Sequence, residues 1–220
     1  MPAPAGGGGA RIMINPRQLE AGTLVVASHN EGKVREIRAM LSPWMLTIIS
    51  AAELDLPEPE ENGTTYKENA IIKSRAAAMA SGYPALSDDS GFEVSAINNA
   101  PGLYSARWAG PSKDFSIAMD KVWTAFCASG QSDRSCRFVC ALSLAWPDGH
   151  DETMIGDIAG SLVWPPRGDK GFGYDPIFSP DGYDETFAEV DPEWKHSVSH
   201  RARAFSTLID RCLADTPRVN

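Results

Sequence analysis

The chain has 220 residues, of which 43% are hydrophobic, and its formal net charge is −9 at pH 7. This composition allows a substantial core in one domain and argues against a broad basic surface for duplex nucleic acid. Residues 1–10 lack the apolar segment of a signal peptide, no apolar run approaches the roughly 18 residues of a membrane span, and the four cysteines form no zinc pattern. We therefore expect a cytoplasmic protein without a nucleic-acid or membrane partner.

The first elements along the chain read as strand, turn and helix. Residues 1–22 are predicted to be a flexible leader because Gly6–Gly9 is costly to order, which leaves a single domain over residues 23–216. The apolar run Leu24–Ala27 predicts a buried strand. A polar turn follows it, and Lys33–Leu41 then has the periodicity of a helix.

A second strand and a capped helix come next. Leu46–Ser50 predicts the strand, and residues 52–64 form an acidic, proline-rich loop. Thr65 and Glu68 have the spacing of a capping box, which opens a helix to about Ala80. Gly82 is a plausible stop for that helix.

The segment Ser87–Gly91 reads Ser-Asp-Asp-Ser-Gly and follows a short apolar run. We predict a turn here, at the end of a strand, with a short strand resuming at Phe92–Val94. Two adjacent carboxylates, Asp88 and Asp89, suit a hard cation such as Mg²⁺, which binds one or two carboxylates and substrate phosphates. The alternative is an ordinary acidic turn.

The second half of the chain predicts a hairpin between two helices. Phe115–Ser129 contains a helix, and Cys136–Trp146 and Thr153–Trp164 are predicted to pair as antiparallel strands. Residues 165–186 look rich in loops, and Ser199 can cap a final helix. Early alternation of strands and helices followed by a hairpin predicts an α/β domain with a mixed sheet flanked by helices.

Three groups of residues before residue 100 could bind a phosphorylated ligand. The turn Ser28–Lys33 precedes a helix, whose N-terminal N–H groups bind phosphate, and Lys33 adds a charge. It is not a P-loop, and an ordinary strand–helix turn is the alternative. Glu60 or Glu61 could complete a metal site with Asp89, and Lys73 could reach phosphate; a solvated loop and a surface lysine are the alternatives.

Two later groups could bind a base. Phe172 lies between glycines and could offer its ring for stacking, while Asp175 could accept hydrogen bonds from base or sugar. The alternative is a tight turn with Phe172 packed inward. Lys195, His200 and Arg201 place donors at the start of the last helix, where they would favour keto oxygens over amino groups; a charged helix start is the alternative.

These motifs, in this order, resemble those of the inosine triphosphate pyrophosphatases, also called dITP/XTP pyrophosphatases. The matching segments are Ser28–Glu36, Glu60–Arg75, Ser87–Gly91, Ala100–Trp108, Gly171–Ile177 and Lys195–Arg201. The resemblance implies an elongated, two-lobed α/β domain with a central mixed sheet, assembled as a homodimer. It implies Mg²⁺-dependent hydrolysis of ITP, dITP and XTP to the monophosphate and pyrophosphate. A Maf-like dTTP or UTP pyrophosphatase and a non-catalytic nucleotide-binding protein are the alternatives.

The resemblance also implies roles for particular residues. Asp89 would be the catalytic base and, with Glu60, would bind the metal, whereas Glu61 and Asp88 stay open as further ligands. His29 departs from the glycine that many members have at this place. The implied substrate-binding residues are Ser28, His29, Asn30, Glu31, Gly32, Lys33, Lys73, Ser90, Phe172, Gly173, Tyr174, Asp175, Lys195, His200 and Arg201.

Overall fold

A computed structural model describes residues 16–219 of the chain. Its centre is a seven-stranded mixed sheet with the order β2-β1-β3-β5-β6-β7, and β4 pairs with β3 outside this path. The strands are β1 (Gly22–Val26), β2 (Leu46–Ser50), β3 (Ala85–Val94), β4 (Ala100–Pro101), β5 (Ser135–Ala145), β6 (Asp151–Leu162) and β7 (Phe178–Pro180). β1 pairs in parallel with β2 and β3, and the remaining pairs are antiparallel. The predicted α/β fold with a mixed sheet is confirmed.

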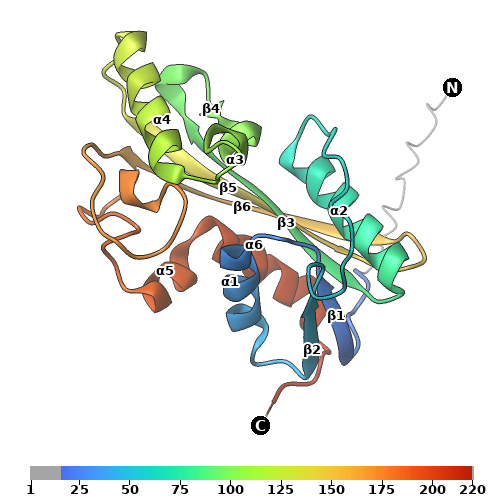
Figure 1. Cartoon of the computed structure of the whole chain (residues 1–220). Coiled ribbons are helices and arrows are strands. Elements are labelled where there is room, and N and C mark those ends of the chain that lie inside the picture. The colour runs from blue at the N-terminus through green and yellow to red at the C-terminus, as the bar shows by residue number, and fades with distance from the viewer. Residues whose placement is uncertain (1–15, 220) are drawn as a thin grey trace, which may run out of the picture.

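Helices cover both faces of this sheet (Figure 1). They are α1 (Glu31–Leu41), α2 (Tyr66–Ser81), α3 (Ser105–Trp108), α4 (Phe115–Ser129), α5 (Pro192–Val198) and α6 (His200–Leu208), and a π-helical turn, Ile209–Leu213, continues α6. In Figure 1, α2 lies on one side of the long strands and α1 and α6 lie on the other, while α3 and α4 sit near their far end.

The described residues form three hydrophobic cores, and the long strands β3, β5 and β6 connect the two larger ones. One core, around α1 and α6, includes Leu86 of β3 and Leu142 of β5. The other, beneath α4, includes Phe92 of β3 and Phe138 of β5. Because one strand supplies both cores, the molecule is elongated and has two lobes, as Figure 1 shows.

Local sequence signals set several helix ends where they were expected. Thr65 accepts a hydrogen bond from the Glu68 N–H at 3.1 Å, and the reciprocal contact completes the capping box of α2. Gly82 ends this helix in a left-handed conformation with φ of 73°. Ser199 caps α6 by accepting from the Ala202 N–H at 3.2 Å. These predictions from the sequence are confirmed.

Two predictions are wrong in detail. Ser87–Gly91 is not a turn, because β3 continues through it and pairs with β5, Asp89 opposite Ala141. The stretch 165–186 is rich in loops, as predicted, and the short strand β7 lies within it. Lys195 does not open the last helix; it lies on a separate helix, α5, which Asp191 caps and which has Pro192 in its first turn.

The predicted leader, residues 1–22, lies mostly outside the described residues. Within the described part, Leu19 is buried and its N–H donates to the Cys212 carbonyl at 2.7 Å. The folded part therefore begins before residue 23. No helix within residues 16–219 has the length and apolar character that a membrane span needs.

Candidate active site

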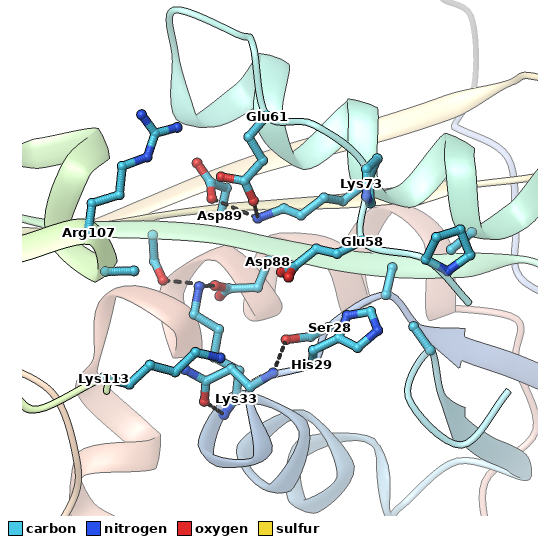
Figure 2. Close-up of a pocket in the computed structure, with 18 of the residues that line it drawn as sticks. Ser28, His29, Lys33, Glu58, Glu61, Lys73, Asp88, Asp89, Arg107 and Lys113 are labelled. Carbon is cyan, nitrogen blue, oxygen red and sulfur yellow. Dashed lines mark hydrogen bonds and ion pairs between the residues drawn. The ribbon is translucent and has the colours of Figure 1, made fainter. Parts of the chain in front are cut away.

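The main cavity opens where β1 and β3 diverge. The two strands pair only at Val25 with Ala85 and Val26 with Leu86, after which β1 turns into α1. Since β2 and β3 flank β1, the sheet has a switch point here, the usual ligand position in α/β folds. The cavity has a volume of about 690 Å³, within the range of ligand sites. Figure 2 shows the side chains that line it.

The N-terminus of α1 forms one wall of this cavity. Asn30 caps the helix by accepting from the Lys33 N–H at 3.1 Å, and its own N–H donates to Ser28 Oγ at 3.1 Å. Ser28, His29, Asn30 and Lys33 line the cavity as predicted. The wall thus combines a helix N-terminus with a lysine, which suits phosphate.

Two other residues of this turn lie elsewhere. Glu31 lines a neighbouring hollow rather than the cavity. A Cβ atom on Gly32 would lie 3.2 Å from Cδ1 of Phe172 and 3.2 Å from Asn30 Oδ1, so the glycine leaves room for the aromatic ring. His29 Nε2 lies 3.0 Å from the Leu56 carbonyl, which connects the turn to the loop that follows β2.

Asp88 and Asp89 point to opposite faces of β3, since side chains alternate along a strand. Asp88 is fully buried and accepts hydrogen bonds from Arg201 Nε at 2.8 Å and Cys140 Sγ at 3.0 Å, while Lys33 Nζ lies 2.5 Å from it. Burial raises the pKa of Asp88, but the charges of Arg201 and Lys33 outweigh burial and hold that pKa well below its usual range. Asp88 is therefore a fixed anion that aligns two cations.

Asp89 faces α2 and has a different environment. Lys73 Nζ lies 2.7 Å from Asp89 Oδ1 and 2.7 Å from Glu61 Oε1. Burial raises the pKa of Asp89, although Lys73 and Lys33 oppose the shift. Neighbouring carboxylates whose pKa values are pushed apart are typical of acid–base sites, and the raised one suits a proton acceptor.

The residues around Asp89 also fit a metal ion that shares its ligands with substrate. Glu61 and Asp89 reach the same ammonium group, so their oxygen atoms approach a common point, and Mg²⁺ commonly takes one or two carboxylates plus phosphate oxygens. Within residues 16–219 no group of three or more metal-ligating side chains converges.

The glutamate at this point is Glu61. The predicted ligand, Glu60, is exposed and lies outside the cavity lining, whereas Glu58 and Glu61 belong to it. Nothing in the sequence separates two adjacent glutamates, because only the course of the loop decides which one faces β3.

A smaller cavity adjoins the first and holds the predicted base-binding residues. It is lined by Phe172, Gly173, Tyr174, Asp175, Lys195, His200 and Arg201. Asp175 accepts from the Phe172 N–H at 2.8 Å and from Lys195 Nζ at 2.6 Å, which fixes the glycine-rich turn. Phe172 is half-buried, with Lys195 Nζ 4.8 Å from its ring centroid.

Tyr174 contributes to the wall of this cavity rather than to its polar groups. Its side chain is buried, its hydroxyl donates to the Ser105 carbonyl at 2.8 Å, and its ring stacks on Phe92 at 5.1 Å. The main task of Tyr174 is therefore to join the turn to the core under α4.

Glu36 completes the base-side cluster, and the sequence reading missed it. It is buried and accepts hydrogen bonds from Lys195 Nζ, at 3.1 Å, and from Arg201. Burial raises the pKa of Glu36, but Arg201 and Lys195 outweigh this effect and lower it. The available signal was its position one helical turn after Lys33, on the same side of α1.

His200 is held neutral in this cluster. Burial, together with the charge of Arg201, keeps its pKa well below the usual range. Its ring stacks on Phe138 at 4.9 Å. Among the described residues its buried Nδ1 has no hydrogen-bond partner, and such a group is costly unless a ligand or water satisfies it. The cluster therefore holds an unused polar atom beside the cavity.

Known proteins are similar to this chain in sequence and in fold. A dITP/XTP pyrophosphatase of Rhodospirillum centenum is 58% identical over 204 residues, covering 92% of this chain and 100% of that protein. One from Zymomonas mobilis is 54% identical over 198 residues, covering 90% and 95%. A HAM1 protein structure from Coxiella burnetii superposes with a TM-score of 0.78 at 38% identity, covering 86% of this chain and 96% of that one.

The family assignment rests on the same part of the chain that forms the two cavities. Residues 24–211 match the Ham1 family, and this range contains the α1 turn, β3, the glycine-rich turn and α6. With this match and relatives above half identity over nearly their full lengths, the chain belongs to the Ham1 family.

Proposed function

We propose that this protein hydrolyses the non-standard purine nucleoside triphosphates ITP, dITP and XTP to the monophosphate and pyrophosphate, in a Mg²⁺-dependent reaction. The observation that carries the proposal is the placement of Asp89 and Glu61 opposite the N-terminus of α1, next to a cavity with an aromatic ring and buried donors. The names of the relatives support the same substrate class. The role would be to remove deaminated purines from the nucleotide pool.

In this reaction a water molecule attacks the α-phosphorus, and the bond from that phosphorus to the α–β bridging oxygen breaks. Asp89 accepts the proton of the water as the general base. Pyrophosphate leaves with the bridging oxygen, and the nucleoside monophosphate remains. When bound by Glu61 and Asp89, Mg²⁺ would neutralise phosphate charge.

The residues around the cavity would hold the phosphates during this step. Lys33 stays aligned by Asp88, at 2.5 Å, and the N–H groups of the α1 turn can donate to phosphate oxygens. These donors are already ordered before substrate binds, so they stabilise developing negative charge at little cost of reorganisation.

The smaller cavity would select the base. Lys195 and Arg201 each contact protein carboxylates but carry more N–H donors than those contacts use. Donors in a buried site bind a 6-keto oxygen and leave a 6-amino group unpaired, so ATP should be a poor substrate. Phe172 would stack on the base, and the unpartnered Nδ1 of His200 offers a further polar contact.

The experiment is product analysis with ITP, XTP, dTTP, GTP and ATP, each with and without Mg²⁺. The proposal expects inosine monophosphate and pyrophosphate in equal amounts, and only with the metal. Release from dTTP instead would support a Maf-like enzyme. Binding of ITP without any product would indicate a non-catalytic nucleotide-binding protein. The homodimer implied by the resemblance stays a prediction that light scattering tests.

A further inference from the structure

The main cavity contains basic residues that the reaction above does not use. Four of its lining residues are cationic: Lys33, Lys73, Arg107 and Lys113. Lys33 is paired with Asp88, and Lys73 is paired with Asp89 and Glu61. Within residues 16–219, Arg107 and Lys113 make no ion pair or side-chain hydrogen bond, and both are exposed. They are the cations of this cavity that no carboxylate of the described residues neutralises.

Both cations come from the segment between η2 (Gly102–Tyr104) and α4, with Arg107 in α3 and Lys113 in the turn before α4. Figure 2 shows Arg107 and Lys113 on the same side of the cavity, with Lys113 extending toward Lys33. The guanidinium of Arg107 lies over the Tyr104 ring at 5.1 Å, which gives it a platform. A ligand bound at the α1 turn would thus meet a second positive wall.

The backbone at Lys113 holds this residue in an unusual conformation. Its φ is 53°, in the left-handed region that a lysine rarely adopts. The turn is closed by hydrogen bonds from the Lys113 N–H to the Gly110 carbonyl at 3.0 Å and from the Asp114 N–H to the Ala109 carbonyl at 3.1 Å. Asp114 then caps α4 by accepting from the Ser116 N–H at 2.9 Å. Strain of this kind persists where the surroundings fix it, commonly at ligand sites.

The relation of the two cavities indicates which part of a nucleotide these cations would meet. Residues shared by both cavities mark the passage from base to phosphates, and they are Asn30, Lys33, Ser90, Ala106 and Phe115. Arg107 follows the shared residue Ala106, and Lys113 lies shortly before the shared residue Phe115. Both Arg107 and Lys113 line only the large cavity. The part of a nucleotide that extends past the shared residues into the large cavity, away from the base, would therefore meet these two cations.

We infer that Lys113 and Arg107 form a subsite for the two outer phosphates, which leave as pyrophosphate. This inference rests on the proposed function and adds the residues that recognise the leaving group. Their free charge would offset that of the outer phosphates, and a monophosphate would not reach them. The subsite makes the enzyme select triphosphates over shorter chains.

The test measures inhibition by magnesium pyrophosphate and by inosine monophosphate in Lys113→Gly and Arg107→Gln. Glycine adopts a positive φ freely, so Lys113→Gly removes the charge without backbone strain. The inference expects the inhibition constant of pyrophosphate to rise about tenfold in each variant, as for loss of one hydrogen bond to a charged group. Inhibition by the monophosphate should stay unchanged.

Two variants serve as controls. Asn99→Gly is the backbone control, because Asn99 also has a positive φ, of 60°, but lies outside this cavity. Lys67→Ala controls for the loss of an exposed lysine.

Unchanged pyrophosphate inhibition in both variants would overturn the inference, and so would an equal loss of monophosphate inhibition. The proposed function fails separately, if the wild-type protein releases no pyrophosphate from ITP. In that case calorimetry with magnesium pyrophosphate still tests the subsite, because binding to the wild type should exceed binding to Lys113→Gly about tenfold.

Discussion

Asp88 and Asp89 are neighbours in the sequence, yet β3 directs them to opposite faces of the sheet. Asp88 is surrounded by Arg201, Lys33 and Cys140, and Asp89 by Lys73 and Glu61. The sequence identifies both as candidates for chemistry. It cannot divide their tasks, because their partners come from other helices, from β5 and from the loop before α2, and only the three-dimensional structure shows which partner each one meets.

Asp89→Asn should lower kcat by about 10²–10⁴-fold, which is the usual contribution of a general base. The melting temperature of this variant should stay nearly unchanged. Asp88→Asn should instead destabilise the fold by about 3–5 kcal/mol, because it leaves buried Arg201 without one of its carboxylates. Steady-state kinetics and denaturant unfolding of both variants measure the contrast. A folded Asp89→Asn protein with wild-type turnover would refute the base assignment.

The adjacent residues Glu60 and Glu61 allow a test of the metal site in which each variant is the control for the other. Glu61→Gln should raise the Mg²⁺ concentration for half-maximal activity about tenfold or more, equivalent to about 1.4 kcal/mol, because it removes a carboxylate that faces Asp89. Glu60→Gln should leave the Mg²⁺ titration unchanged, since Glu60 lies outside the cavity lining. The reverse pattern would return the ligand role to Glu60.

Phe172→Ala should raise KM for ITP by the equivalent of about 1–3 kcal/mol, the usual value of base stacking, with little change in kcat. Tyr174→Phe is its control in the same turn. It removes only the hydroxyl that donates to Ser105, so it should lower stability by about 1 kcal/mol and leave KM unchanged. An unchanged KM in Phe172→Ala would mean that the ring serves packing against Gly32 alone.

At the scale of elements, local signals predicted most strands and helices but not the course of β3. The capping box of α2 and the serine cap of α6 depend on residues within one turn, so the sequence reveals them. Ser87–Gly91 has the composition of a turn, but pairing with β5 along the whole strand overrides that preference. α5 was missed although Asp191 and Pro192 carry a helix-start signal.

Close packing explains why β3 has a glycine at residue 91. A Cβ atom there would lie 2.4 Å from the Gly102 carbonyl oxygen and 2.5 Å from the Tyr66 hydroxyl. Gly91→Ala should therefore destabilise the protein by about 1–3 kcal/mol, as overpacking usually does. Denaturant unfolding measures the loss, and an unchanged midpoint would show that η2 and α2 move aside freely.

At the scale of the whole molecule, two lobes with separate cores meet at the cavity that would hold the nucleotide. The α1 turn belongs to one lobe, and Arg107 and Lys113 belong to the segment that leads into the other. Sequence motifs predicted the two-lobed fold through resemblance alone. The sequence does not predict that Arg107 and Lys113 line the cavity, because no local pattern distinguishes exposed cations that face a cavity from those that face solvent.

A ligand that contacts both lobes should stabilise the whole molecule. With the Asp89→Asn protein, which should bind without turnover, ITP and Mg²⁺ at about 100 times Kd should add about 2.7 kcal/mol to stability. A thermal melt measures the shift, with ATP at the same concentration as the comparison. Equal shifts with ITP and ATP would contradict a base-selective site.

The most direct measurement of the central claim is the ratio of kcat/KM for ITP to that for ATP, followed as pyrophosphate release with Mg²⁺. A buried site that donates to a keto oxygen predicts a ratio of at least about 100. A ratio of one or less would contradict the account, because the donors of Lys195, His200 and Arg201 would then not read the base.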